Sequence, residues 1–123
     1  MSKSSRMTRI NEEIKKEISD IIRQDLKDPR INQLMVSVIN VDTTNDLKHC
    51  KVYISVMGDK NQKEGVLEGL KSAGGFIRRE IARRINLRNT PEFIFKLDDS
   101  IEYGIHLSKI LDDINQDAKE DIK

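Results

Sequence analysis

Hydrophobic residues in the first part of the chain recur every three or four positions, which is the spacing of an amphipathic helix. They are Met7, Ile10, Ile14, Ile18, Ile21, Ile22 and Leu26. Ser5 or Thr8 can cap the start of this helix. The Asp28-Pro29 pair should end it, because the residue before a proline is pushed away from helical angles.

Two segments with the character of β-strands follow. Residues 34–41 are rich in β-branched side chains, and residues 48–57 alternate between apolar and polar positions. The apolar face of the second segment carries Cys50, Val52, Ile54 and Val56. Because residues 42–46 form a turn-type cluster, we expect an antiparallel hairpin with one buried and one solvent-exposed face.

Two further helices are predicted over residues 62–73 and 76–87, and the second carries Ile77, Ile81 and Ile85 at helical spacing. Gly74 and Gly75 stand between them. Two glycines inside a helix cost roughly 2 kcal/mol relative to two alanines, so a kink is expected there.

The chain after Pro91 is predicted to form a strand over residues 92–97, in which Phe93, Phe95 and Leu97 pack in the core. A short helical pattern follows, with Leu107, Ile110, Leu111 and Ile114. We expect residues 1–115 to form a single domain and residues 116–123 to be an acidic, disordered tail.

The predicted order is helix, strand, strand, helix, kink, helix, strand. It indicates an α+β fold in which a three-stranded sheet packs against helices. The KH type of RNA-binding domain uses the same strand–helix–helix–strand unit. Its Gly-x-x-Gly clamp occurs nowhere in this chain, which argues against a standard KH contact with single-stranded RNA.

Composition narrows the class of protein. Hydrophobic residues make up 37% of the 123 positions, which suffices for one core, and no run approaches the roughly 20 apolar residues that span a bilayer. The one cysteine, Cys50, excludes an internal disulfide, and its position favours a place in the core. The N-terminus lacks the apolar stretch of a signal peptide, so we expect a cytoplasmic protein.

No motif for catalysis or metal binding is present. His49, His106 and Cys50 are too few and too dispersed for a His/Cys zinc site. The chain has no Gly-x-x-x-x-Gly-Lys loop, and no local motif joins serine, histidine and aspartate. We therefore expect no enzyme activity, no metal and no cofactor.

The net charge of +1 conceals two blocks of opposite sign. Residues 71–88 hold six basic residues and one acid, a net +5, whereas residues 98–123 hold three lysines and eight acids, a net −5. On a helical wheel Arg79 and Arg83 lie opposite the isoleucine stripe, and Arg78 and Arg84 flank it. Guanidinium groups suit bidentate contacts to phosphate, although a solvated helix face is the alternative interpretation.

The basic residues predicted to contact RNA are Lys71, Arg78, Arg79, Arg83, Arg84, Arg88 and Lys96. Gly74 and Gly75 either cap a helix or let a nucleic-acid backbone approach the start of the third helix. The N-terminal residues Lys3, Arg6 and Arg9 could add contacts or form a mobile arm.

Several stretches resemble the ribosome-binding factor A family, which comprises bacterial assembly factors of the small ribosomal subunit. The most specific stretch covers residues 88–104 and includes Pro91-Glu92-Phe93 and Glu102-Tyr103-Gly104. Residues 6–11 and 28–30 are also similar. The family replaces the KH clamp with an Ala-x-Gly kink, which Ala73-Gly74-Gly75 matches. The resemblance extends over residues 6–114.

The resemblance implies a type II KH-like fold and a non-enzymatic factor that binds the free 30S subunit. Such a factor assists late maturation of 16S rRNA near its 5′ region and is important in cold adaptation. The implied partners are 16S rRNA, neighbouring ribosomal proteins and an assembly GTPase that promotes release. We expect no membrane contact and a monomer. The alternative is a protein-interaction module whose acidic tail or hairpin face binds a protein and whose basic helix is incidental.

Overall fold

A computed structural model describes residues 5–98 and 108–114 of the protein. Its elements, in chain order, are α1 (Ser5–Asp20), the π-helix η1 (Ile21–Asp25), the 3-10 helix η2 (Gln33–Met35), β1 (Val36–Thr43), β2 (His49–Val56), α2 (Lys60–Ser72), α3 (Gly74–Arg84) and β3 (Glu92–Leu97). Residues 108–114 form a further short helix. The described residues therefore confirm the predicted α+β order.

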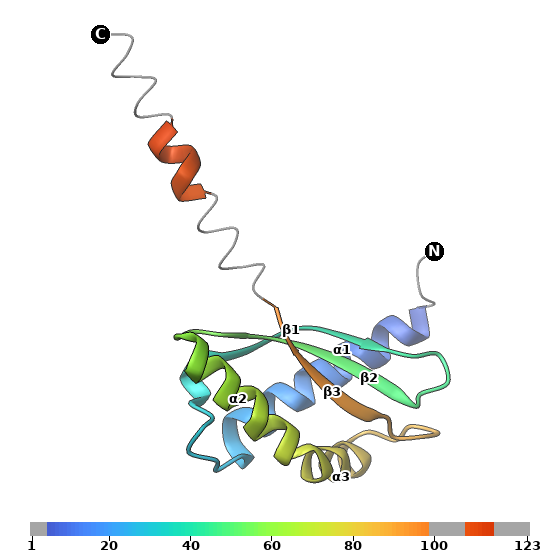
Figure 1. The fold of residues 1–123 in the computed structure, drawn as a ribbon. Helices are drawn as coiled ribbons and strands as arrows, with labels where there is room; N and C mark the ends of the chain where they lie inside the picture. Colours follow the sequence, from blue (N-terminus) through green and yellow to red (C-terminus); the bar gives the residue numbers. More distant parts are fainter. Residues whose placement is uncertain (1–4, 99–107, 115–123) are drawn as a thin grey trace, which may run out of the picture.

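The described strands form one sheet in the order β1-β2-β3 (Figure 1). β1 and β2 are antiparallel, as the hairpin prediction required, and Val38 and Asn40 flank a β-bulge. β2 and β3 are parallel, so α2 and α3 form the crossover between them. The helices lie on one face of the sheet, with α1 against β1 and α2 against β3.

The core lies between the sheet and these helices. Ile14 and Ile18 of α1 and Ile77 and Ile81 of α3 are fully buried, as the helical periodicity predicted. Along β2, buried and more exposed side chains alternate, which confirms the single buried face. Cys50 is fully buried beside Thr43, whose hydroxyl donates to the cysteine Sγ at 3.4 Å, so its predicted place in the core is confirmed.

Local capping explains where α2 begins. The Asp59 carboxylate accepts a hydrogen bond from the Gln62 backbone, and the Gln62 side chain accepts one from the Asp59 backbone. This capping box satisfies two amide groups that the first turn leaves free. At the end of the first helical segment, the Leu26 amide donates to the Ile21 carbonyl in a π-turn that periodicity did not predict.

Several predicted boundaries differ from the structure, most of them by one or two residues. The first strand begins at Val36 rather than residue 34, because the Asn32 side chain caps a 3-10 turn through the Leu34 amide. α3 ends at Arg84 rather than residue 87, since Ile85 is extended (φ −123°, ψ 127°). The break between α2 and α3 falls on Ala73, and both glycines belong to the first turn of α3.

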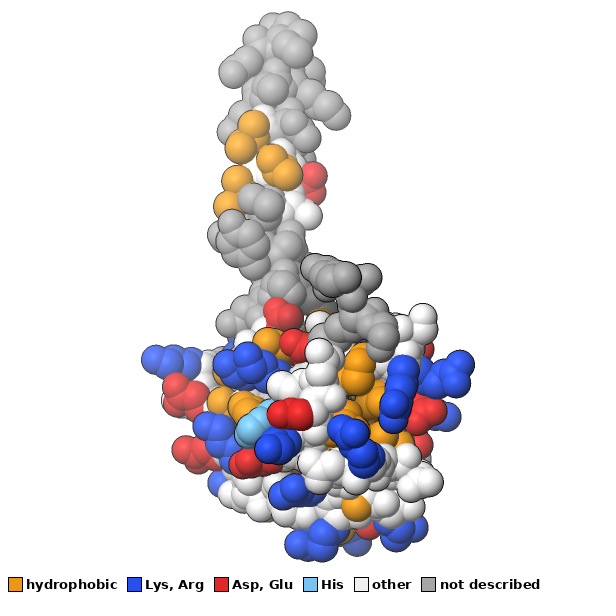
Figure 2. Space-filling view, turned by 90° about the vertical axis from the view of Figure 1, so that its right-hand side faces the viewer, with side chains coloured by type: hydrophobic (Ala, Val, Ile, Leu, Met, Phe, Trp, Pro, Cys, Tyr) orange, Lys and Arg blue, Asp and Glu red, His pale blue; other side chains and the backbone are white. Residues whose placement is uncertain are grey.

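The described residues beyond β3 expose apolar side chains. Ile110, Leu111 and Ile114 are all exposed on the helix of residues 108–114, where hydrophobic side chains are visible in Figure 2. No helix within residues 5–98 or 108–114 is long and apolar enough to cross a membrane. Lys3, His106 and the predicted tail of residues 116–123 lie outside the described residues, and the domain boundary stays a prediction.

Candidate nucleic-acid interface

The orientation of α3 is fixed by its buried isoleucines. Because Ile77 and Ile81 are fully buried, the opposite side of the helix faces solvent, and Arg79 and Arg83 lie there. This arrangement confirms the wheel geometry. Figure 2 shows basic side chains at the lower end of the molecule, the level at which α3 lies in Figure 1.

The two outward arginines of α3 differ in their partners. Arg79 makes no ion pair with any described residue, and its Nη1 atom lies 3.4 Å from the position that a Cβ on Gly75 would occupy. The Arg83 side chain is 68% exposed and pairs with Glu80 at 2.8 Å. The hydrogen bond from Arg83 lowers the pKa of Glu80, so this carboxylate remains charged. Both guanidinium groups remain accessible to an external anion.

Arg78 and Arg88 extend this basic surface toward β3. The Arg78 guanidinium donates to the Thr90 carbonyl at 3.0 and 3.2 Å, which holds an exposed side chain beside the loop before β3. Arg88 is exposed in that same loop. We use the name arginine face for Arg78, Arg79, Arg83 and Arg88.

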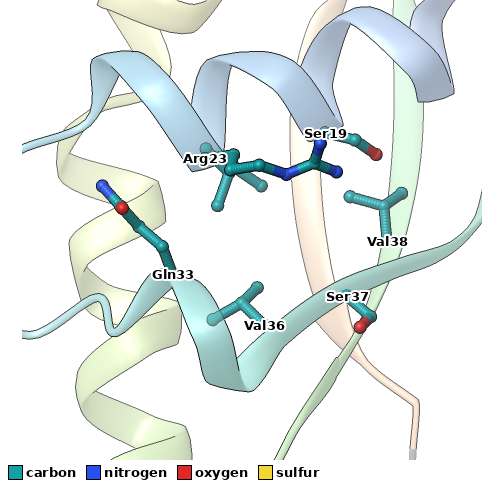
Figure 3. A pocket seen from close by; sticks show the side chains of 7 residues that line it. Ser19, Arg23, Gln33, Val36, Ser37 and Val38 are labelled. Carbon is teal, nitrogen blue, oxygen red and sulfur yellow. The ribbon is translucent and has the colours of Figure 1, made fainter.

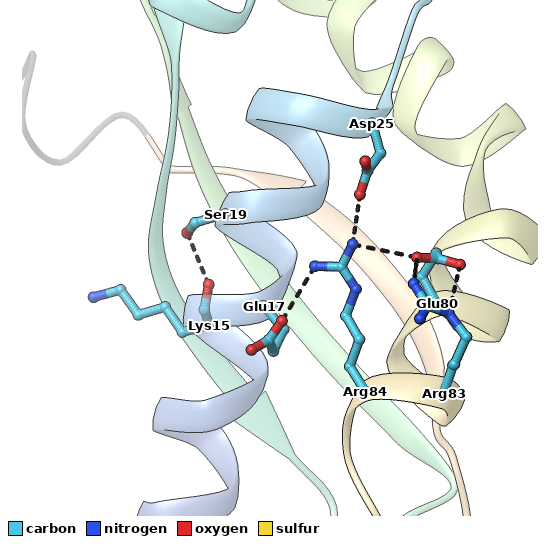
Figure 4. Close-up of polar contacts among 7 residues, drawn as sticks. All are labelled: Lys15, Glu17, Ser19, Asp25, Glu80, Arg83 and Arg84. Carbon is cyan, nitrogen blue, oxygen red and sulfur yellow. Dashed lines mark hydrogen bonds and ion pairs between the residues drawn. The ribbon is translucent and has the colours of Figure 1, made fainter.

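Arg84 has a different environment from the other arginines of α3 (Figure 4). Its side chain is 20% exposed and lies within 3.2 Å of Glu17, 2.6 Å of Asp25 and 3.2 Å of Glu80. These ion pairs join α1, η1 and α3. We therefore remove Arg84 from the predicted phosphate contacts, because three carboxylates already occupy its guanidinium group.

The remaining predicted contacts are dispersed. Lys71 is exposed at the end of α2. Lys96 pairs with Tyr53 on the outward face of the sheet, on the opposite side from α3. Arg6 and Arg9 are exposed on the first turns of α1. The structure therefore places the arginine face on α3 and the loop that follows it, and it places Lys96 on the opposite side of the sheet.

The kink leaves backbone open to solvent. A Cβ on Gly74 would meet nothing within 4 Å, so an external group could approach this turn closely. Gly58 is the described glycine with positive φ, and Gly74 and Gly75 adopt helical angles. The chain conformation at the kink therefore does not require glycine. The absence of side chains at these two positions instead favours a function at the surface, where it leaves the backbone accessible.

A groove of about 720 Å³ lies between residues 25–30 and the α2–α3 kink. Its lining includes Phe76, Ala73 and Ser72 on the helical side and Lys27, Asp28 and Arg30 on the loop side. Hydrogen bonds from the side chain and the backbone of Arg30 lower the pKa of Asp28 to about 2. The sequence analysis did not identify this groove. The sequence feature that could have indicated the groove is Phe76, an aromatic residue directly after the two glycines.

A smaller hollow of about 200 Å³ lies between α1, η1 and β1 (Figure 3). Arg23 extends over it toward Ser19 and Val38, and Gln33 and Val36 form the other side. Its lining contains no carboxylate, thiol or imidazole, so it offers no nucleophile–base pair. Within residues 5–98 and 108–114, no three His, Cys, Asp or Glu side chains are grouped to hold a metal ion.

Comparisons with known proteins identify the family. The family model described as ribosome-binding factor A matches residues 6–111. Ribosome-binding factor A of Clostridium tetani is 58% identical over 118 residues, which cover 96% of this chain and 97% of the relative.

Solved structures agree in fold. The crystal structure of ribosome-binding factor A from Thermus thermophilus superposes with a TM-score of 0.65 at 25% identity, covering 74% of this chain and 93% of that one. A homology model of the Thermus thermophilus factor, fitted into the cryo-EM map of a 30S–RbfA complex, gives a TM-score of 0.56 at 23% identity, covering 80% and 97%. These likenesses confirm the predicted KH-like fold. With a family model that spans residues 6–111 and a relative 58% identical along nearly its whole length, the chain belongs to the ribosome-binding factor A family.

Proposed function

We propose that this protein is a non-enzymatic assembly factor that binds the free small ribosomal subunit through the phosphates of its 16S rRNA. The observation that carries the proposal is the arginine face, which presents four exposed guanidinium groups beside an open backbone turn. Membership of a family named for ribosome binding supports the choice of partner. The description of a family member in a 30S complex agrees with it.

The chemistry of the arginine face suits RNA backbone. A guanidinium group donates two parallel hydrogen bonds to a phosphate and retains its charge at every physiological pH. Arg79 and Arg83 are a turn apart on α3, so they can engage neighbouring phosphates along one strand. The first turn of α3 adds free amide groups and the positive end of the helix dipole at the kink.

The proposed mechanism is stabilisation of one rRNA conformation. A rigid protein surface binds the arrangement of phosphates that matches it better than the alternatives, and the equilibrium shifts by that difference in affinity. No chemical step is required. We infer that the favoured state belongs to late maturation of the subunit, near the 5′ region of 16S rRNA, where slow rearrangement in the cold makes the factor most important.

The family resemblance supports four finer expectations. The protein acts as a monomer in the cytoplasm, neighbouring ribosomal proteins add contacts, and an assembly GTPase promotes its release. Each of these is separable from RNA binding, because none of them concerns the phosphate contacts. Phosphate binding by the arginine face does not depend on any of these expectations.

Co-sedimentation tests the proposal directly. Purified protein is centrifuged with isolated small subunits, isolated large subunits and joined ribosomes, at low and moderate salt. We expect selective binding to free small subunits that weakens as salt rises, because phosphate contacts release counterions. Equal binding to all three particles would indicate general RNA binding without preference for the small subunit. Absence of binding to any particle would refute the proposal.

The alternative function, a protein-interaction module, rests on exposed apolar side chains. Leu34 is 94% exposed and Met57 is 68% exposed, and both lie at the end of the sheet where β1 begins and β2 ends. Exchange of Arg79 and Arg83 for glutamate distinguishes the two functions. The exchange should abolish association with the subunit if phosphates are bound, and it should leave association intact if a protein surface makes the contact.

A further inference from the structure

We propose that the groove between residues 25–30 and the α2–α3 kink receives one unpaired nucleobase from the RNA strand that binds along α3. This inference rests on the proposed function, because it assigns a base contact beside the phosphate contacts of the arginine face. The arguments are the position of the groove, its fixed walls and the chemistry of its lining.

The groove opens directly beside the outward face of α3. Phe76 lines it from the first turn of the helix, and Arg79 and Arg83 follow at positions i+3 and i+7. Residues with this spacing lie on one side of a helix, one above the other. An RNA strand whose phosphates contact the two arginines therefore passes the mouth of the groove, where one base can turn inward.

Ion pairs hold the loop wall of the groove in place. The Arg30 guanidinium donates to both carboxylate oxygens of Asp28, at 3.0 Å from Nε and 2.7 Å from Nη2, and the Arg30 amide donates to Asp28 at 2.9 Å. At the other end of the wall, Asp25 is bound by Arg84. Asp28 is thus neutralised by Arg30, whereas Asp25 shares the Arg84 guanidinium with Glu17 and Glu80. The exposed Lys27, between these two acids in the loop, adds a positive charge to the same wall.

The helical wall of the groove is fixed by close packing. Gly69 is buried, and a Cβ there would approach the Ile31 side chain to 3.0 Å. The loop therefore lies directly against α2 at this point. A cavity with two fixed walls needs little reorganisation to bind a planar group, and this lowers the entropic cost of binding.

The lining matches a nucleobase better than a peptide side chain. Phe76 is half-buried, packs against the core and offers an aromatic surface, on which any base can stack. Lys27 is exposed at the loop wall, where it can contact the sugar–phosphate backbone beside the base, whereas the Arg30 guanidinium is held by Asp28. An apolar floor with a flanking lysine, continuous with a basic helix, suits the binding of single-stranded RNA.

Two matched RNA probes test the proposal. One is a short single-stranded oligoribonucleotide, and the other has the same phosphates but carries abasic sites. Fluorescence anisotropy measures binding of both to the full-length protein, to Phe76→Leu and to Phe76→Tyr, with Leu67→Ala as the control. Leu67 is also half-buried against the core, but it does not line the groove.

We expect the native protein to bind the intact RNA roughly tenfold more tightly than the abasic RNA, because one stacked base contributes about that factor. Phe76→Leu should lose this preference, and Phe76→Tyr and Leu67→Ala should retain it. Thermal unfolding of each variant separates loss of the aromatic surface from loss of the fold. Phe76→Tyr retains the ring, so a lost preference in this variant as well would contradict stacking.

The remaining outcomes distinguish this inference from the proposed function. If both RNAs bind equally and Arg79→Gln weakens both, the phosphate contact stands and the base site is refuted. If Phe76→Leu binds RNA normally but loses association with small subunits, the groove holds a protein segment and the base site is again refuted. If neither RNA binds and small subunits do not bind either, the proposed function fails together with the base site.

Discussion

The Nη2 atom of Arg84 lies 2.6 Å from the Oδ2 atom of Asp25, which joins the end of α3 to η1 across 59 positions of the chain. The same guanidinium group contacts Glu17 on α1 and Glu80 on α3. The basic helix is therefore anchored by one of its own arginines. The arginines of α3 thus divide into one that positions the helix and others that face solvent.

Replacement of Arg84 should weaken the fold and leave the phosphate contacts intact. Arg84→Gln removes the cation shared by three carboxylates, and we expect the free energy of unfolding to fall by about 1 to 3 kcal/mol. Urea unfolding measures this loss. Arg83→Gln, at a 68% exposed side chain, serves as the control and should lower the stability less. Equal losses in the two variants would contradict the anchoring role.

The salt dependence of RNA binding should report the number of phosphate contacts. With the four residues of the arginine face, the logarithm of the affinity for RNA should fall with the logarithm of salt at a slope of roughly −2.8 to −3.6. Arg79→Gln combined with Arg83→Gln should make this slope shallower by about 1.4 to 1.8. Lys15→Gln combined with Lys16→Gln is a control with the same charge change on the exposed side of α1. A flat salt response of the native protein would refute the arginine face.

Gly74→Ala should separate stability from binding at the kink. Because the position is helical and a Cβ there meets nothing within 4 Å, alanine should stabilise the protein by about 0.5 to 1 kcal/mol. The added methyl group should nevertheless weaken RNA binding if backbone approaches this turn.

Gly65→Ala provides the matched control for the kink. Gly65 lies within α2, where a Cβ would make an ordinary contact with Arg30 at 3.9 Å. We expect this variant to gain stability and to bind RNA as the native protein does. If Gly74→Ala also binds as tightly as the native protein, the kink does not contact RNA. Thermal unfolding and anisotropy titrations measure the two effects independently.

Asp28 should contribute to the pH dependence of stability. Its folded-state pKa of about 2 lies below the ordinary value of 3.8, because the charged carboxylate accepts hydrogen bonds from Arg30. The stabilisation of the folded state by this charged carboxylate is fully present above the ordinary pKa and is lost as the pH falls through about 2. When urea unfolding is measured as the pH is lowered from 3.8 to about 2, the Asp28→Asn variant should therefore lose less stability than the native protein.

The sequence predicted the elements better than it predicted the site. Periodicity located α1, β2 and β3, because the apolar faces of Ile14, Val52 and Phe95 are set by the spacing of local structure. The role of Arg84 could not be predicted, since its partners on α1 and η1 become neighbours only after the helices pack. The groove beside Phe76 depends on the same packing. Long-range ion pairs and concave surfaces leave no periodic signal in a single sequence.

The parallel pairing of β2 with β3 determines when the interface can form during synthesis. β2 lies in the middle of the sheet, but the strand that completes it is made only after α2 and α3. Until residues 92–97 are available, one hydrogen-bonding edge of β2 remains open and α2 lacks the strand against which it packs. Such non-local pairing delays folding. A chain interrupted before β3 therefore carries all the arginines of α3 but has no complete sheet on which to position them.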